Sequence, residues 1–166
     1  FTRNFRAASP IVTSYRFVED RLGGGGVWDL LIPAPESLDE PFLAQVRELQ
    51  TQLRHEVEFE IDGQTHRLTK VVSLVDILDA GAAATSSLVN WLPLSARLRM
   101  LDNQLPFVSG TLHAADPAQP GQHYYRIMLR ARERQPTASK LALIRQVEAA
   151  ARAKFPGARA TGFFVL

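Results

Sequence analysis

Apolar residues recur along the chain with two different spacings. In residues 125–131 every second residue is apolar, and most of the residues between them are arginines. This alternation predicts a strand that buries one face. In residues 42–53 and 141–151 apolar residues recur instead at intervals of three and four, which predicts helices with one buried side. The chain therefore mixes strands and helices.

Proline, glycine and capping residues set the order of these elements. The expected order is a helix over residues 9–22, a strand over 27–32, a helix over 39–53, strands over 57–61 and 67–74, an insert, a strand over 125–132, a helix over 138–155 and a strand over 159–166. Two βαβ units with right-handed crossovers can interleave into one four-stranded antiparallel sheet with both helices on one face. The fold class predicted is thus α+β, with a ferredoxin-like split βαβ arrangement.

The domain organisation follows from this order. We expect one domain with an entry helix and glycine hinge over residues 1–26, a first βαβ unit over 27–74, an insert over 75–124 and a second βαβ unit over 125–166. Within the insert, residues 74–80 predict a short helical turn and residues 85–103 a helix broken at Pro93. Residues 105–113 are expected to be extended.

Composition narrows the function classes. The 166 residues are 46% hydrophobic and 22% charged, which is ordinary for a globular chain. There is no cysteine, which excludes disulfides, thiolate metal sites and cysteine nucleophiles. The net charge of +2 is too small to argue for nucleic acid by itself. No apolar run approaches the ~18 residues of a membrane-spanning helix.

Four consecutive glycines, Gly23, Gly24, Gly25 and Gly26, precede the first strand. A phosphate-binding loop follows a strand and opens a helix, and Trp28 stands where its third glycine belongs. We therefore interpret the four glycines as a hinge.

Arginines occupy the polar side of the strand over residues 125–132 and extend beyond it. Arg126, Arg130, Arg132 and Arg134 share one parity, so they are expected on one face. One interpretation is a solvated face whose arginines have carboxylate partners on a neighbouring strand. The other is a site for anionic headgroups, which arginine binds in a bidentate manner.

The insert carries a second candidate site, made of apolar side chains. Its members include Trp91, Leu94, Leu98 and Met100. Such a set either packs the insert onto the sheet or forms an apolar wall for a lipid-like substrate, for which methionine and aromatic side chains are adaptable.

Other candidate chemistry is weaker. The four histidines have no metal-binding spacing, and no metal or cofactor site is expected. Asp76 and Asp79 are three residues apart and are expected to serve as turn or cap residues. No serine lies in a nucleophile-elbow motif, so no catalytic residue is proposed.

Several motifs, in order along the chain, carry a family resemblance. They are SPIV at 9–12, YRFVE at 15–19, LGG at 22–24, KVVSLVDIL at 70–78, RIMLR at 126–130 and ATGFFVL at 160–166. Together they resemble the second extracytoplasmic domain of RND-superfamily exporters, in the branch that contains the mycobacterial membrane protein large family and hopanoid-associated transporters. Residues 80–122 have little counterpart in this pattern.

The resemblance implies most of the functional expectations. It implies a porter-type domain on the periplasmic side of a bacterial inner membrane, without enzyme activity or a cofactor, in a proton-driven transporter that forms a possible homo-oligomer. Its partners would be the membrane helices and first periplasmic domain of the parent protein, and its substrates hydrophobic or amphiphilic. A chain that starts at Phe1 and ends on an apolar run favours a piece of a longer protein over the alternative for this run, a final buried strand.

Two alternatives stay open. The run at 160–166 faintly resembles an RNA-recognition signature, which would make the chain a stand-alone ferredoxin-like domain for RNA or another anion. That signature belongs on a third strand rather than a last one, so no nucleic acid is expected. The apolar insert could instead dock a second copy or an adaptor.

Overall fold

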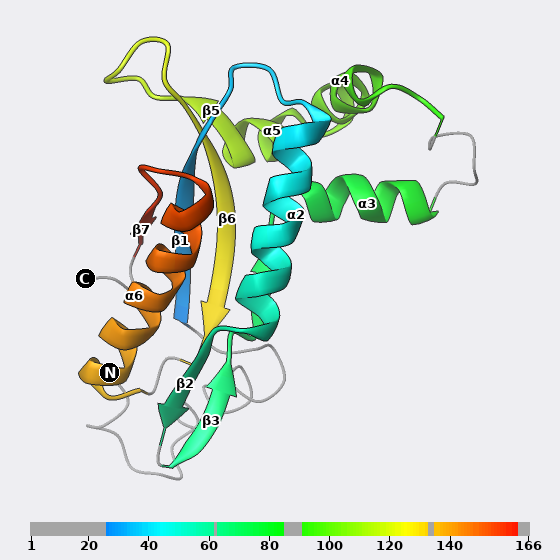
Figure 1. The fold of residues 1–166 in the computed structure, drawn as a ribbon. Coiled ribbons are helices and arrows are strands. Elements are labelled where there is room, and N and C mark those ends of the chain that lie inside the picture. Colours follow the sequence, from blue (N-terminus) through cyan, green and yellow to red (C-terminus); the bar gives the residue numbers. More distant parts are fainter. Residues whose placement is uncertain (1–25, 62, 85–90, 133–134, 163–166) are drawn as a thin grey trace, which may run out of the picture.

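A computed structural model describes residues 26–61, 63–84, 91–132 and 135–162 (Figure 1). The helix expected over residues 9–22 and the glycines Gly23, Gly24 and Gly25 lie outside these ranges. Gly26 is the first residue of strand β1, where it pairs with Ala131. It therefore belongs to the sheet and not to the expected hinge.

The centre of the fold is a long antiparallel pair of strands. β1 (Gly26–Ala34) and β6 (His123–Ala131) pair over nine positions each. β4 (Lys70–Val72) pairs with the other edge of β6, and β7 (Arg159–Thr161) with the other edge of β1. The resulting order β4-β6-β1-β7, with every pair antiparallel, is the split βαβ arrangement. The predicted fold class is confirmed, with a fifth short strand, β5 (His113–Ala115), added beside β6.

Two helices cover one face of this sheet, α2 (Glu40–His55) and α6 (Thr137–Lys154) (Figure 1). Asp39 caps α2 by accepting a 2.8 Å hydrogen bond from Phe42 N, and Pro41 occupies the first turn, where its missing N–H costs nothing. The predicted stripe of α2 was Phe42, Val46, Leu49 and Leu53. The last three are fully buried and Phe42 is partly buried, while Leu43 joins the buried side.

The buried side of α6 differs from the prediction at one position. Ile144, Val147 and Ala151 are buried as expected, but Leu143 takes the place of Leu141, which is 47% exposed. A helix advances 100° per residue, so a stripe wide enough to cover the sheet can include either neighbour of a strict three-and-four pattern. Packing against the sheet decides which of the two is buried.

Alternation along the central strands fills the core beneath these helices. Tyr125, Ile127 and Leu129 of β6 are fully buried, as are Leu30 and Ile32 of β1. Burying each such side chain stabilises the fold by roughly 1.5–3 kcal/mol. The residues between them, such as Asp29 and Arg126, belong to the opposite face of the sheet.

The segment predicted as one strand over residues 67–74 passes between two sheets: Arg67 ends a strand of one sheet, and Lys70–Val72 forms a strand of the other. β2 (Glu58–Ile61) and β3 (Gln64–Arg67) form a separate two-stranded hairpin, which Figure 1 shows at one end of the fold. The chain then crosses Leu68 and Thr69 to reach β4, and Thr69 N donates a 2.8 Å hydrogen bond to Arg130 O. Local alternation cannot reveal this change of partner, because the pairing joins distant segments.

The insert contains α3 (Leu74–Ala84), α4 (Leu94–Gln104) and α5 (Pro106–Leu112) before it reaches β5. The extended conformation predicted for residues 105–113 is therefore wrong for most of that segment. Pro106 does not interrupt α5, because it stands at the first position of this helix, where the fixed φ of proline suits the helical conformation. Val108 and Leu112, four residues apart, then reach the core.

Candidate binding site

A cavity of about 410 Å³ lies between the insert and the end of β1. Its walls come from the loop after β1, the first residue of α3, the helices α4 and α5, and the start of β5. The lining residues are Glu36, Ser37, Leu38, Leu74, Ser95, Leu98, Leu101, Asp102, Pro106, Ser109, Gly110 and His113. Its volume falls in the range of pockets that hold small organic ligands, roughly 300–1,000 Å³.

Leucines form the apolar part of this cavity. Leu74 is buried in the core, and Leu38, Leu98 and Leu101 are partly buried against it. Leu98 and Leu101 lie one turn apart on α4 with Leu94 a further turn away, so a single side of that helix both packs on the core and faces the cavity. The cavity therefore offers hydrocarbon contact on its inner side.

Polar groups surround the leucines. Glu36 and Asp102 are exposed at the cavity, and neither carboxylate has an ion pair or hydrogen bond within the part of the chain that the structure describes. Nε2 of His113 lies 3.0 Å from Pro35 O, to which it can donate when protonated, and its ring stacks on His123 at a centroid distance of 5.8 Å. The cavity is thus amphipathic.

Burial lowers the pKa of His113 below 6.5, its ordinary value. The neighbouring His123 adds to this shift, whereas the hydrogen bond to Pro35 and the charge of Asp102 oppose it. At neutral pH the imidazole is therefore uncharged.

This shift predicts a loss of stability in mild acid. As the pH falls through about 6.5, the unfolded chain binds a proton at His113 before the folded chain does, so the free energy of unfolding decreases. Thermal unfolding between pH 8 and pH 5 should show a smaller loss in His113→Gln, which retains a donor for Pro35 but does not titrate. A variant that loses as much stability as the original chain over this range would contradict the assignment.

Ion pairs and a cap hold the walls of the cavity in place. Arg97 Nη2 of α4 lies 2.6 Å from Glu40 Oε1 at the start of α2. At the start of α3, Asp76 Oδ2 accepts a 2.7 Å hydrogen bond from Ser73 N, as in a capping box. Asp76 and Asp79 therefore serve structural roles: Asp76 caps α3, as predicted, and Asp79 pairs with Arg47 of α2 at 2.9 Å.

The cavity contains only one of the four predicted apolar site residues, Leu98. Leu94 packs against the core, which agrees with the interpretation that this apolar set packs the insert onto the sheet. Trp91 and Met100 are 72% and 41% exposed and do not line the cavity. Two of the four thus lie on the inner side of α4 or in the cavity, because the sequence pattern alone could not tell which side of the helix faces inward.

The predicted arginines of the described ranges lie elsewhere, and Arg134 is outside those ranges. Arg126 Nη2 makes a 2.8 Å ion pair with Asp29 Oδ2, a carboxylate on the neighbouring strand β1, as the structural interpretation of this face expected. Arg130 belongs to the same face of β6, and Arg132 is exposed just beyond the end of that strand. None of the three lines the cavity.

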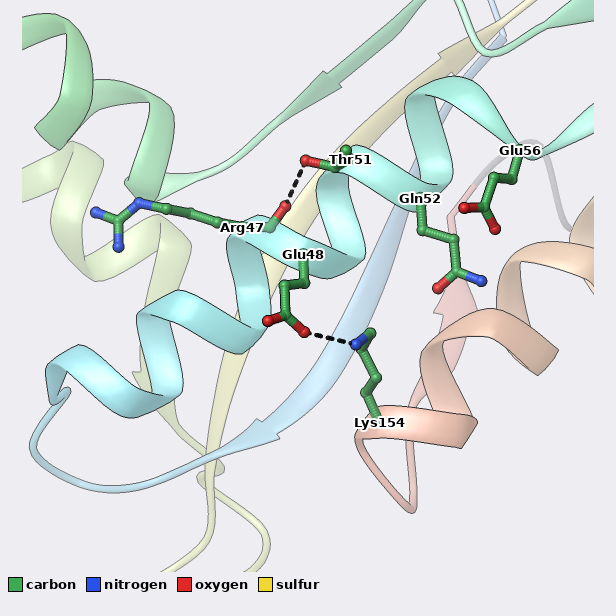
Figure 2. Close-up of a pocket in the computed structure, with 6 residues that line it drawn as sticks. All are labelled: Arg47, Glu48, Thr51, Gln52, Glu56 and Lys154. Carbon is green, nitrogen blue, oxygen red and sulfur yellow. Dashed lines mark hydrogen bonds and ion pairs between the residues drawn. The ribbon is translucent and has the colours of Figure 1, made fainter.

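A second hollow, of about 490 Å³, lies over α2 and the end of α6 (Figure 2). Its polar side chains include opposite charges: Lys154 Nζ lies 2.8 Å from Glu48 Oε2, and Figure 2 shows Gln52 and Glu56 beside them. Arg47 points away toward α3. Paired charges on a shallow helical surface are typical of a solvated face, and we do not assign this hollow a function.

The described ranges contain neither a candidate metal site nor a candidate membrane span. No group of three or more histidine, aspartate or glutamate side chains there is arranged to hold a metal ion. None of the helices in those ranges combines the length and apolar character that crossing a bilayer requires. The chain matches no family model, no curated protein and no solved structure.

Proposed function

We propose that this chain is a porter-type extracytoplasmic domain of an RND-type exporter and that it receives hydrophobic or amphiphilic molecules in the cavity beside its insert. The observation that carries the proposal is the cavity itself: a split βαβ sheet bears a helical insert that encloses leucines with a polar rim. Such a lining suits a molecule with a hydrocarbon part and a polar end.

The positions of the resembling motifs support the same proposal. The KVVSLVDIL motif forms β4 and the capped start of α3, and its Leu74 lines the cavity. The RIMLR motif forms the middle of β6, the strand that joins both βαβ units. Both motifs thus build the frame on which the insert is mounted.

The cavity also suggests how transport would use this domain. One wall follows β1 of the first βαβ unit, and another belongs to the insert that leads into β6 of the second. Rocking of the two units as separate bodies would break the nine-position pairing of β1 with β6. Movement of the insert against the loop after β1, driven from membrane helices of the parent protein, would instead open and close the space between these walls.

Binding of a neutral apolar fluorophore, N-phenyl-1-naphthylamine, to the 166-residue chain tests the proposal. We expect saturable binding that Leu98→Gln weakens roughly tenfold, because a polar side chain replaces apolar contact worth about 1.5 kcal/mol. Leu141→Gln, at an exposed position of α6, is the matched control and should bind like the original chain. Circular dichroism would confirm that both variants are folded. No saturable binding, or equal affinity in both variants, would contradict the proposal.

The face of the sheet opposite α2 and α6 favours a second candidate function, binding of RNA or another polyanion. Lys70 of β4 is directly opposite Arg130 of β6, and the Arg159 guanidinium lies 4.9 Å from the centre of the Tyr124 ring. However, Asp29 neutralises Arg126 at the centre of this face. Because a paired arginine contributes little to the attraction of a polyanion, we prefer the cavity as the functional site.

A further inference from the structure

The polar rim of the cavity is negatively charged. We propose that the cavity selects amphiphiles whose polar end is a cation, such as an alkylammonium group. This inference rests on the proposed function, because it specifies the class of molecule that the same cavity receives. It also differs from the sequence-based expectation of an anionic headgroup bound by the arginines.

The first argument is the balance of formal charge around the cavity. Two of its lining side chains, Glu36 and Asp102, are carboxylates, and no lysine or arginine is among the described lining residues. His113 is the remaining titratable side chain there, and its burial keeps it uncharged at neutral pH. A ligand in the cavity therefore meets a net negative rim.

The second argument is that these carboxylates are available. In the described ranges neither Glu36 nor Asp102 has an ion pair or hydrogen bond, whereas Glu40 on the adjacent helix is bound by Arg97 at 2.6 Å. An ionised carboxylate only accepts hydrogen bonds, so it favours a ligand with N–H donors or positive charge. An anionic headgroup would be repelled by both groups.

The third argument is the arrangement of apolar and acidic groups within one space. Leu38 follows Glu36 by two residues in the loop after β1, and Leu98 precedes Asp102 by one turn of α4. Each wall thus presents a leucine and a carboxylate together. A hydrocarbon chain on the leucines would place its polar end at the rim, where the carboxylates are.

The hollow in Figure 2 shows the contrast within the same chain. There Lys154 compensates Glu48 at 2.8 Å, and the lining includes both signs of charge and no leucine. It has neither the apolar wall nor the unpaired acidic rim. Its carboxylates therefore provide a control for the loss of negative charge at a different place.

The experiment compares three probes of one chain length on the 166-residue chain: decyltrimethylammonium, decyl sulfate and decyl maltoside, each below its micelle concentration. Each probe displaces N-phenyl-1-naphthylamine. We expect the ammonium probe to bind roughly tenfold more tightly than the sulfate at low salt, and this ratio to shrink as ionic strength rises, because exposed charges are screened.

The double variant Glu36→Gln, Asp102→Asn should lose this preference while its affinity for decyl maltoside stays within about twofold. The double variant Glu48→Gln, Glu56→Gln removes the same formal charge at the hollow of Figure 2 and should keep the preference.

The possible results separate the two proposals. If none of the three probes displaces the fluorophore, the proposed function fails. If all bind but the sulfate binds as tightly as the ammonium, or if the rim double variant keeps the preference, the charge inference is overturned while the function stands.

Discussion

Replacing Asp76 with alanine should lower the free energy of unfolding by about 3 kcal/mol, more than a typical surface substitution. Its carboxylate accepts hydrogen bonds from Ser73 N at 2.7 Å, Gln50 Nε2 at 2.6 Å and Arg54 Nη2 at 2.6 Å. The first caps α3, which contributes about 1 kcal/mol at such positions.

The other two contacts make this cap more important than an isolated one. Gln50 is only 1% exposed, so without Asp76 its amide would be left buried without this partner, at a cost of roughly 1–3 kcal/mol. Solvent screens the contribution of Arg54, whose side chain is 39% exposed. Loss of the carboxylate therefore weakens the junction of α2, β4 and α3 together.

Urea unfolding followed by far-ultraviolet circular dichroism measures this effect. Asp79→Ala is the matched control, since Asp79 lies on the same helix and pairs with Arg47 at the surface. We expect the control to lose less than about 1 kcal/mol. Equal and small losses in the two variants would show that the contacts of Asp76 do not stabilise the fold.

Replacing Tyr125 with phenylalanine should cost about 2 kcal/mol, although it removes a single oxygen atom. The phenol oxygen accepts a 2.9 Å hydrogen bond from Val75 N and lies 2.9 Å from Ser73 Oγ. Both of these groups are buried, and the shape of the side chain is otherwise preserved, so the loss is that of a buried polar pairing.

A readout at high pH separates this contact from simple packing. Burial raises the pKa of Tyr125 from 10.0 to about 12. Between these values the unfolded chain releases the phenol proton and the folded chain retains it, so stability falls as the pH rises through this range. Tyr125→Phe should show a smaller alkaline loss than the original chain. An unchanged slope between pH 10 and pH 12 would rule out a buried phenol at this position.

The main sheet and its helices could be predicted because their patterns are local. The alternation in residues 125–131 requires only that one face of the strand be buried. In the structure, this is the face of β6 that packs against α2 and α6. The capping residue Asp39 is equally local, because its side chain reaches only Phe42 N, three positions on. Features of this kind depend on neighbouring residues in the chain.

The parts of the fold that could not be predicted depend on contacts with segments far away in the sequence. The split of residues 67–74 between β3 and β4 follows from the pairing of β4 with β6, more than fifty positions away. The conformation of α5 likewise follows from its packing on the core through Val108 and Leu112. Neither partner is visible in the local sequence.

The candidate site was predicted in part for the same reason. Leu98 was found because it belongs to an apolar helix, whereas Glu36 and His113 came from a loop and a short strand without any motif. The cavity forms where this loop, α4 and the start of β5 come together, and only the tertiary fold brings them together. The sequence holds one signal of this site: Glu36 and Asp102 each lie within four positions of a leucine that lines the cavity.

The pairing of β1 with β6 also bears on the order in which this fold can form as the chain is made. Asp29 and Arg126, joined by an ion pair across these strands, lie 97 positions apart in the chain. Contacts of such long range form slowly, because the chain loses the entropy of closing a large loop before the new contacts stabilise it. During synthesis, β1 and α2 therefore emerge long before the strand that completes their sheet, and their apolar sides stay uncovered by that strand until β6 has emerged as well.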